Sequence, residues 1–244
     1  MKRFLIVLSV LLFFVGVVYA KGVYYYGSKT VTGGGTTVYI GTTTCGAQSC
    51  TYASSDGTYI NPSAGDTTYD TGTAVIIDGN AGIGLIYLDT SNLPADKTIT
   101  SAKLWLYAAS VDSTPDGSVT FHKMLTMPGD STNTTWTENN VTYNERDASG
   151  NVQWGGDAQA CPLSGTDYDA ASLVTMAATD FTLSKFNEVS SATLTTLVHG
   201  WYSGGINNYG LIIFNSGDYS DVQVRSEDTP TAAQRLYWEI TYTE

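Results

Sequence analysis

The chain has 244 residues, of which 42% are hydrophobic and 14% are charged, and its 23 acidic and 11 basic residues give a net charge of −12. This acidic excess argues against binding to nucleic acid or to an anionic membrane surface, because both depend on clustered basic side chains. The 17 tyrosines favour β-strands and the 25 glycines favour turns, so the composition predicts an all-β protein.

The first twenty residues have the organisation of a secretion signal peptide. Lys2 and Arg3 precede an apolar run over 4–18, and Ala20 offers a small residue at a cleavage point. We therefore expect residues 1–20 to be removed and the mature protein to be secreted or held at the cell surface, without membrane contact. An uncleaved anchor is the alternative, although the run is short for a span of ~20 residues.

Residues 21–55 differ in charge from the rest of the chain. They contain two lysines and no acidic residue, whereas all 23 acidic residues lie from Asp56 onwards. Short β-prone pieces separated by glycines predict an extended N-terminal arm. Such an arm can add a strand to the sheet edge of a neighbouring subunit, or it can pack on its own domain. The residues expected to form the assembly arm are Val23, Tyr24, Tyr25, Tyr26, Val38, Tyr39 and Ile40.

Two cysteines lie close together in this arm. Cys45 and Cys50 are separated by four residues, and an exported chain meets oxidising conditions. This spacing suits a local disulfide at a hairpin tip, which would leave Cys161 unpaired. The alternatives are that Cys161 bonds one of the first two cysteines or a cysteine of another chain.

Residues 56–244 alternate short apolar runs with turn signals, which is typical of a jelly-roll or Greek-key β-sandwich. In 101–108, the residues Lys103, Trp105 and Tyr107 alternate with small and apolar ones, as in a strand with one buried face. Residues 193–202 are the best helical candidate, because their apolar residues share one face. The expected strands are 58–60, 74–77, 85–88, 101–108, 119–124, 141–143, 181–183, 209–214, 222–225 and 236–242.

Five segments of this domain carry motifs of a known family, in the family's order. They are 83–94 (IGLIYLDTSNLP), 98–107 (TITSAKLWLY), 136–144 (WTENNVTYN), 194–212 (LTTLVHGWYSGGINNYGLI) and 222–242, which contains Ser226 and Glu227. The domain therefore resembles the DNRLRE-domain, or disaggregatase-related, family of extracellular β-sandwich modules. One departure lies at Ile83 and Gly84, where the family usually has a basic residue, so any ligand contact by that residue is absent here.

The resemblance implies an extracellular module that is usually non-catalytic. Relatives occur in surface-layer and cell-wall proteins, and beside polysaccharide lyases as carbohydrate-binding modules. The sequence itself offers little for catalysis, because His122 and His199 are isolated and no nucleophile motif is complete. We therefore expect no enzyme.

The surroundings of a few residues indicate possible ligand contacts. Trp154 lies in a polar, glycine-rich segment, which predicts an exposed ring that can contact a glycan, whereas the other tryptophans follow strand or helix patterns expected in the core. Arg225 is a candidate for a local basic contact. Acidic turns could hold a structural Ca²⁺ or be merely solvated, and the candidate turns are those of Asp66 with Asp70 and of Asp78 with Asn80.

Two functions follow as hypotheses. The first is a structural subunit of an extracellular filament, because a cationic β-prone arm and an anionic domain could associate head to tail into a homopolymer. The second is a carbohydrate-binding or surface-adhesion module, supported by the family resemblance, with an extracellular polysaccharide as its partner. The strongly negative charge disfavours an acidic polysaccharide unless Ca²⁺ or a basic patch intervenes.

Overall fold

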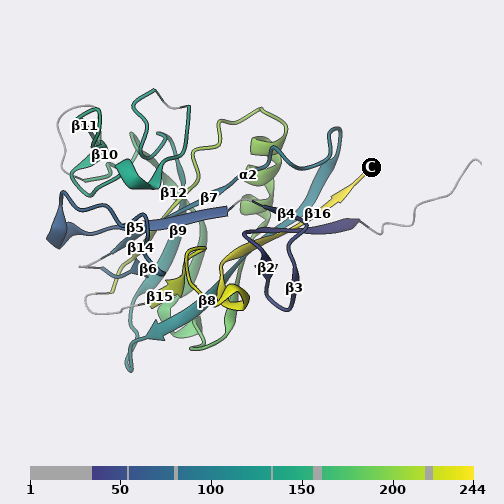
Figure 1. Ribbon diagram of the computed structural model, residues 1–244, viewed down its shortest axis with the longest axis horizontal. Helices are drawn as coiled ribbons and strands as arrows, with labels where there is room; N and C mark the ends of the chain where they lie inside the picture. Colours follow the sequence, from purple (N-terminus) through teal and green to yellow (C-terminus); the bar gives the residue numbers. More distant parts are fainter. Residues whose placement is uncertain (1–34, 54, 80–81, 133, 156–160, 218–221) are drawn as a thin grey trace, which may run out of the picture. The chain divides into compact units, whose positions relative to one another are not determined.

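A computed structural model describes residues 35–244, except 54, 80–81, 133, 156–160 and 218–221. The chain divides into two compact units, Met1–Gly34 and Gly35–Glu244, and all described residues belong to the second. The expected signal peptide and the arm residues Val23, Tyr24, Tyr25 and Tyr26 lie outside the described residues. The second unit is built almost entirely from β-strands (Figure 1), as the composition predicts.

Two sheets make up this unit. The larger has seven strands, in the order β4-β1-β16-β8-β15-β6, with β13 paired to β8. These strands are β1 (Thr36–Gly41), β4 (Tyr52–Ala53), β6 (Ala74–Ile77), β8 (Thr98–Val111), β13 (Phe186–Ser190), β15 (Val222–Arg225) and β16 (Tyr237–Thr243). The smaller has five strands, in the order β12-β9-β14-β7-β5. These are β5 (Ser55–Ile60), β7 (Ile83–Leu88), β9 (Ser118–Met124), β12 (Tyr168–Ala177) and β14 (Leu211–Asn215).

Shorter elements connect the sheets. Two hairpins are formed by β2 (Thr44–Cys45) with β3 (Gln48–Ser49) and by β10 (Glu145–Asp147) with β11 (Val152–Gln153). The helix α2 (Ala192–Tyr202) begins after Ser191, whose side chain accepts a hydrogen bond from the Leu194 amide, and this confirms the helix predicted over 193–202. The 3-10 turns are η1 (Pro62–Ala64), η2 (Glu138–Asn140), η3 (Ala178–Asp180) and η4 (Ala232–Gln234).

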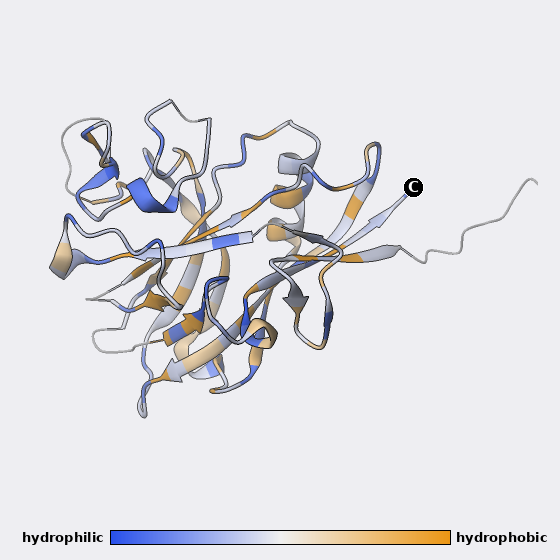
Figure 2. Cartoon of the chain, in the orientation of Figure 1, coloured by the Kyte–Doolittle hydropathy of each residue, from blue (hydrophilic) through white to orange (hydrophobic). Residues whose placement is uncertain are grey.

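The two sheets pack face to face, which confirms the predicted β-sandwich. Alternation along β8 points Leu104 and Leu106 inward, where both are fully buried. They share one core with residues of the smaller sheet such as Phe121 of β9 and Ile213 of β14. Figure 2 shows hydrophobic residues mainly on the strands and hydrophilic ones mainly on the connections, as expected for a domain with its core between two sheets.

The other face of the five-stranded sheet is also buried. Leu85 of β7 and Ile212 of β14 point away from the main core and pack in a second cluster with Val141 and Trp154. The segment between β9 and β12, which carries β10 and β11, therefore covers this face. Burial on both faces explains why β7 and β14 are apolar at nearly every position.

The strand β1, which contains part of the expected arm, belongs to the seven-stranded sheet of its own chain. It pairs antiparallel with β16 of the same chain, from Thr36 opposite Tyr242 to Ile40 opposite Trp238, and the two strands lie side by side in Figure 1. Val38 and Ile40 are buried in the main core. Residues 36–41 thus pack on their own domain, which is the alternative expected for the arm, and donation of the arm to a neighbouring subunit stays a prediction. The compact unit that contains them begins at Gly35.

Two predicted strands are wrong for a shared physical reason. At 141–143 the backbone forms a turn, because the amides of Thr142 and Glu145 bond locally to Glu145 O and Thr142 Oγ1. At 181–183, Phe181 closes the turn η3, and the Thr182 amide donates to the side chain of Asn187. In both segments local bonds use the groups that a sheet needs.

The predicted disulfide between Cys45 and Cys50 is confirmed, and Cys161 is unpaired. None of the helices in the described residues combines the length and apolar character needed to cross a membrane.

Candidate functional site

The outward face of the seven-stranded sheet carries aromatic side chains that the strand register brings together. Trp105 of β8 lies opposite Tyr237 of β16, and Tyr107 of β8 lies opposite Phe186 of β13. Tyr39 of β1 is in ring contact with Tyr237. Because residues opposite each other in antiparallel strands point to the same side, these five aromatic residues share one face, and we call them the aromatic strip.

Ring contacts continue along the strip. Tyr237 is the hub, with ring centroids 6.3 Å from Tyr39, 6.1 Å from Trp105 and 5.2 Å from Phe186. Phe186 in turn meets Tyr107 edge to face at 5.3 Å. Tyr237 is buried at the centre of the strip, and the other four side chains are partly exposed. Contacts with neighbouring rings hold each ring in place, so the strip offers a preformed apolar surface.

Charged groups lie among the rings of the strip. Lys103 of β8 pairs with Glu188 of β13 at 3.0 Å and with Glu239 of β16 at 3.9 Å. Trp105 donates its Nε1–H to Glu239 at 3.1 Å, and the Lys103 ammonium lies 5.8 Å from the Trp105 ring centroid. Their side chains remain 22–35% exposed, so these charged groups are available to a ligand lying on the strip.

The hairpin of β2 and β3, which the Cys45–Cys50 disulfide closes, lies beside Tyr237 of the strip. A Cβ placed on Gly46 would lie 3.0 Å from the Tyr237 hydroxyl, and Gly46 has a φ of +64°, so glycine is required there on both grounds. Burial raises the pKa of Tyr237 to about 12, with further contributions from Glu239 and Tyr39. Its hydroxyl is therefore protonated at neutral pH and can donate a hydrogen bond.

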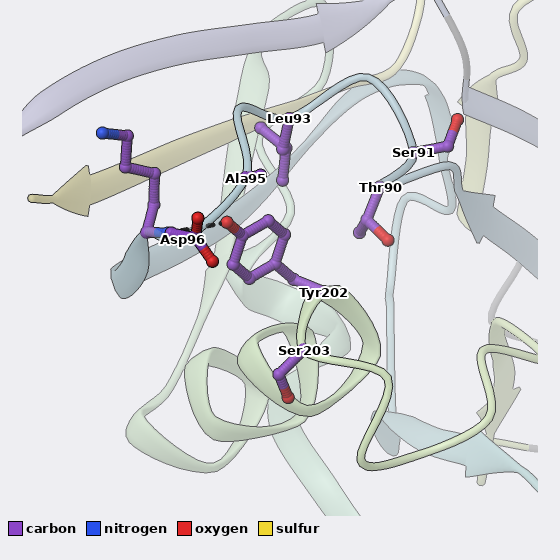
Figure 3. A pocket seen from close by; sticks show the side chains of 8 residues that line it. Thr90, Ser91, Leu93, Ala95, Asp96, Tyr202 and Ser203 are labelled. Atoms are coloured by element: carbon purple, nitrogen blue, oxygen red, sulfur yellow. Dashed lines mark hydrogen bonds between the residues drawn. The ribbon is translucent and has the colours of Figure 1, made fainter.

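A hollow of about 470 Å³ lies at the C-terminal end of α2 (Figure 3). Tyr202 donates its hydroxyl proton to Pro94 O and accepts a hydrogen bond from the Lys97 amide, which fixes the loop after β7 against the helix. The hydroxyl of Tyr202 is thus already hydrogen-bonded to other groups of the protein. The hollow is lined by Thr90, Ser91, Leu93, Ala95, Asp96, Lys97, Tyr202 and Ser203.

A second hollow, of about 420 Å³, is strongly acidic, and we call it the acidic hollow. It brings together Asp56 of β5, Glu138 of η2 and Glu227 after β15, with one carboxylate oxygen of each within 4.8 Å of the others. Trp136 also lines it and stacks on Tyr87 at a centroid distance of 5.3 Å. The residues that line the acidic hollow are Asp56, Asp70, Trp136, Thr137, Glu138, Asn139, Glu227 and Asp228.

Local hydrogen bonds position these carboxylates. Ser226 is fully buried; its hydroxyl donates to Gly72 O and accepts from the Asp228 amide, and the resulting turn carries Glu227. Asp56 lies opposite Tyr87 in the sheet, beside the ring on which Trp136 stacks. Glu138 follows Trp136 by two residues at the start of η2.

The electrostatics of the acidic hollow favour protons or a cation. Burial, followed by the charge of Asp56, raises the pKa of Glu138. Burial, followed by the charge of Glu138, raises the pKa of Glu227. The pKa of Asp56 is raised by burial and by Asp89. Three carboxylates so close together cannot all be ionised without a compensating positive charge.

Trp154 is a correction to the sequence analysis. Its side chain is fully buried in the second cluster, and its Nε1–H donates to Thr142 O at 3.0 Å. The prediction of an exposed ring is therefore wrong, and a sugar has no surface of Trp154 to contact. The residues around Trp154 are polar because they belong to a surface loop. The Trp154 side chain anchors this loop to the five-stranded sheet.

Arg225 is at the end of β15 opposite Ala74, and it lines neither hollow among the described residues. The calcium ligands expected in acidic turns, Asp66 with Asp70 and Asp78 with Asn80, stay a prediction. Asp66 accepts a hydrogen bond from Asn144, Asp70 lines the acidic hollow, and Asp78 forms a bridge with Gly82. Asn80 lies outside the described residues.

The sequence analysis missed the acidic hollow because its carboxylates come from residues 56, 138 and 227, far apart in the chain. A partial signal was available, since Glu138 and Glu227 both lie in segments that carry the family motifs. The sequence predicts one part of the strip, because its alternation puts Lys103, Trp105 and Tyr107 on one face of a strand.

One family of known protein modules matches part of the chain. Residues 48–155 match the model of carbohydrate-binding module family 96. The chain is thus related to carbohydrate-binding modules over this segment, which includes Trp105 and Tyr107 of the strip and Trp136 of the acidic hollow. No curated protein matches the chain.

Proposed function

We propose that this chain is a non-catalytic carbohydrate-binding module of the DNRLRE type, exported from the cell, which binds a polysaccharide across the aromatic strip. The observation that carries this proposal is the family match over 48–155, which contains the strand that supplies Trp105 and Tyr107. The secretion signal expected at residues 1–20 supports an extracellular location.

The strip has the chemistry that a sugar chain requires. Sugar rings have apolar C–H faces that pack on aromatic rings and hydroxyl groups that need hydrogen-bond partners. Trp105 and Tyr107 supply rings, while Lys103 and Glu188 supply a donor and acceptors beside them. Because the rings follow one another across β1, β16, β8 and β13, the strip suits an extended chain rather than a single sugar.

The ligand is expected to be a neutral polysaccharide. Glu188 and Glu239 lie among the rings, and Lys103, which pairs with both, is already neutralised. The chain as a whole carries a net charge of −12. A polyanionic glycan would therefore meet repulsion over the strip and from the rest of the molecule.

The two hollows fit a polysaccharide less well. In the hollow of Figure 3 the Tyr202 hydroxyl is occupied by Pro94 and Lys97. In the acidic hollow, Glu138 Oε1 and Glu227 Oε2 are almost inaccessible to solvent, so a sugar ring cannot reach them. The strip has no such restriction, because four of its five rings are partly exposed.

The test is binding of a panel of neutral and acidic polysaccharides by affinity electrophoresis, followed by titration calorimetry with soluble oligosaccharides. Trp105→Ala is expected to weaken binding at least about tenfold, or about 1.4 kcal/mol. Trp105→Phe retains a ring and is expected to lose less. Leu163→Ala removes an exposed apolar side chain in the connection between β11 and β12 and serves as the matched control. Binding that survives Trp105→Ala unchanged would reject the strip as the site.

A further inference from the structure

The acidic hollow contains buried carboxylate oxygens without hydrogen-bond partners. Glu227 is 8% exposed, and its Oε2 atom has no hydrogen-bond partner among the described residues. Glu138 lines the same hollow; its Oε1 atom is also buried without a hydrogen-bond donor, and its carboxyl group lies against that of Glu227. An unpartnered buried carboxylate is costly, so a ligand that satisfies it is favoured.

Among the described residues that line the hollow there is no lysine, arginine or histidine. Lys97, Lys103 and Lys123 form ion pairs elsewhere and do not line the hollow. Asp70 and Asp228 also line the hollow and add to the negative potential. The arrangement therefore lacks a positive partner, and a bound cation would supply one.

From this geometry we propose that Asp56, Glu138 and Glu227 form a binding site for one Ca²⁺ ion. The oxygens of the three carboxylates lie within 4.8 Å of one another, a separation that two ligands on opposite sides of Ca²⁺ reach at bond lengths of about 2.4 Å. Glu227 lines this hollow together with Asp56 and Glu138.

The donor set selects the class of metal. All three ligands are carboxylates, which hard cations prefer, and the cluster contains no histidine or cysteine to favour Zn²⁺. Mg²⁺ requires a tight octahedron at about 2.1 Å, whereas Ca²⁺ accepts six to eight oxygens in flexible arrangements. Asn139 and water can complete a Ca²⁺ shell, because Asn139 also lines the hollow.

The ion would join three distant parts of the chain. Asp56 belongs to the edge strand β5, Glu138 to the segment that covers the five-stranded sheet, and Glu227 to the turn after β15 in the other sheet. A ligand that binds the folded state and not the unfolded chain stabilises the fold by mass action. The site therefore acts as a structural cross-link, independent of glycan binding.

The experiment is calorimetric titration of the chelator-treated, desalted protein with CaCl2 and with MgCl2, beside thermal unfolding with and without each salt. We expect one Ca²⁺ per chain, tighter than Mg²⁺, and a higher unfolding midpoint with Ca²⁺. Glu227→Gln keeps the shape of the side chain and removes one charge, so its Ca²⁺ affinity should fall at least about tenfold. Glu227→Gln also relieves the repulsion between neighbouring carboxylates, so we expect this variant to fold.

Asp66→Asn is the matched control. It removes a carboxylate that bonds Asn144 outside the hollow, and it should leave Ca²⁺ affinity unchanged. The proposal is overturned if neither binding nor a shift of the unfolding midpoint is seen at millimolar Ca²⁺. It is equally overturned if Glu227→Gln binds as tightly as the wild type, because the ion would then lie elsewhere, or if Mg²⁺ binds in preference. None of these outcomes depends on a glycan.

Discussion

Trp105 and Tyr237 lie directly opposite each other on neighbouring antiparallel strands, with ring planes inclined by 15°. This pair sits at the middle of the aromatic strip, between Tyr39 on one side and Phe186 with Tyr107 on the other. In the proposed binding mode, this pair lies under the middle of the bound sugar chain and Tyr39 lies under one end.

The first prediction concerns ligand length. Trp105→Ala should weaken binding of short and long oligosaccharides alike, because the central ring is used by every bound chain. Tyr39→Ala, at one end of the strip, should weaken binding of long chains and spare short ones. Calorimetric titration with a series of oligosaccharides of increasing length measures both. Equal losses for both variants at every length would contradict an extended binding strip.

The second prediction concerns Trp154. Because the ring is fully buried and its Nε1–H bonds Thr142 O, Trp154→Ala should cost about 3–5 kcal/mol of unfolding free energy. Urea unfolding followed by circular dichroism measures this cost. Glycan affinity of the folded fraction should not change, and a selective loss of affinity at unchanged stability would restore a contact role for Trp154.

The third prediction concerns the disulfide. Cys45 and Cys50 close a loop with a sequence separation of 5, for which the loss of chain entropy in the unfolded state corresponds to about 2 kcal/mol. The double variant Cys45→Ser, Cys50→Ser should be destabilised by this amount in denaturant unfolding. A reducing agent should destabilise the wild type similarly and leave the double variant unaffected. A similar effect on both proteins would show that the agent acts elsewhere.

The fourth prediction concerns pH in the presence of a chelator. The folded state holds protons on Glu138 and Glu227 more tightly than the unfolded chain does, because the pKa of each is raised above the ordinary value of 4.5. Their contribution to stability is therefore greatest below pH 4.5 and declines as the pH rises towards neutrality. Glu227→Gln removes this decline, so its stability relative to the wild type should increase with pH. A constant difference between pH 4 and pH 8 would contradict the buried carboxylate pair.

The fifth prediction concerns the N-terminal region. A chain starting at Gly35 retains the whole compact unit and should fold, whereas one starting at Asp56 loses the core residues Val38 and Ile40 and should be strongly destabilised. Electron microscopy and size-exclusion chromatography of the mature chain and of the chain starting at Gly35 should show the same monomers. Filaments formed by the longer chain alone would support assembly through residues 21–34.

Local patterns in the sequence predict an element and its buried face correctly where only one face of that element is buried. The alternation around Trp105 and the helical spacing of Leu194 gave the correct faces, because period and burial agree there. The strand β12 was missed because none of its side chains is fully buried and it shows no alternation. Trp154 was misjudged because its burial depends on strands far away in the sequence, which no local window contains.

The pairing of β1 with β16 sets an order of events during biosynthesis. Thr36, near the start of the compact unit, is hydrogen-bonded alongside Tyr242, near its end, and β16 lies between β1 and β8 in the sheet. The seven-stranded sheet therefore cannot close until β16 has been synthesised. Pairing between segments so far apart in the sequence is slow to form, so an incomplete chain leaves the edges of β1 and β8 unpaired while it waits for β16.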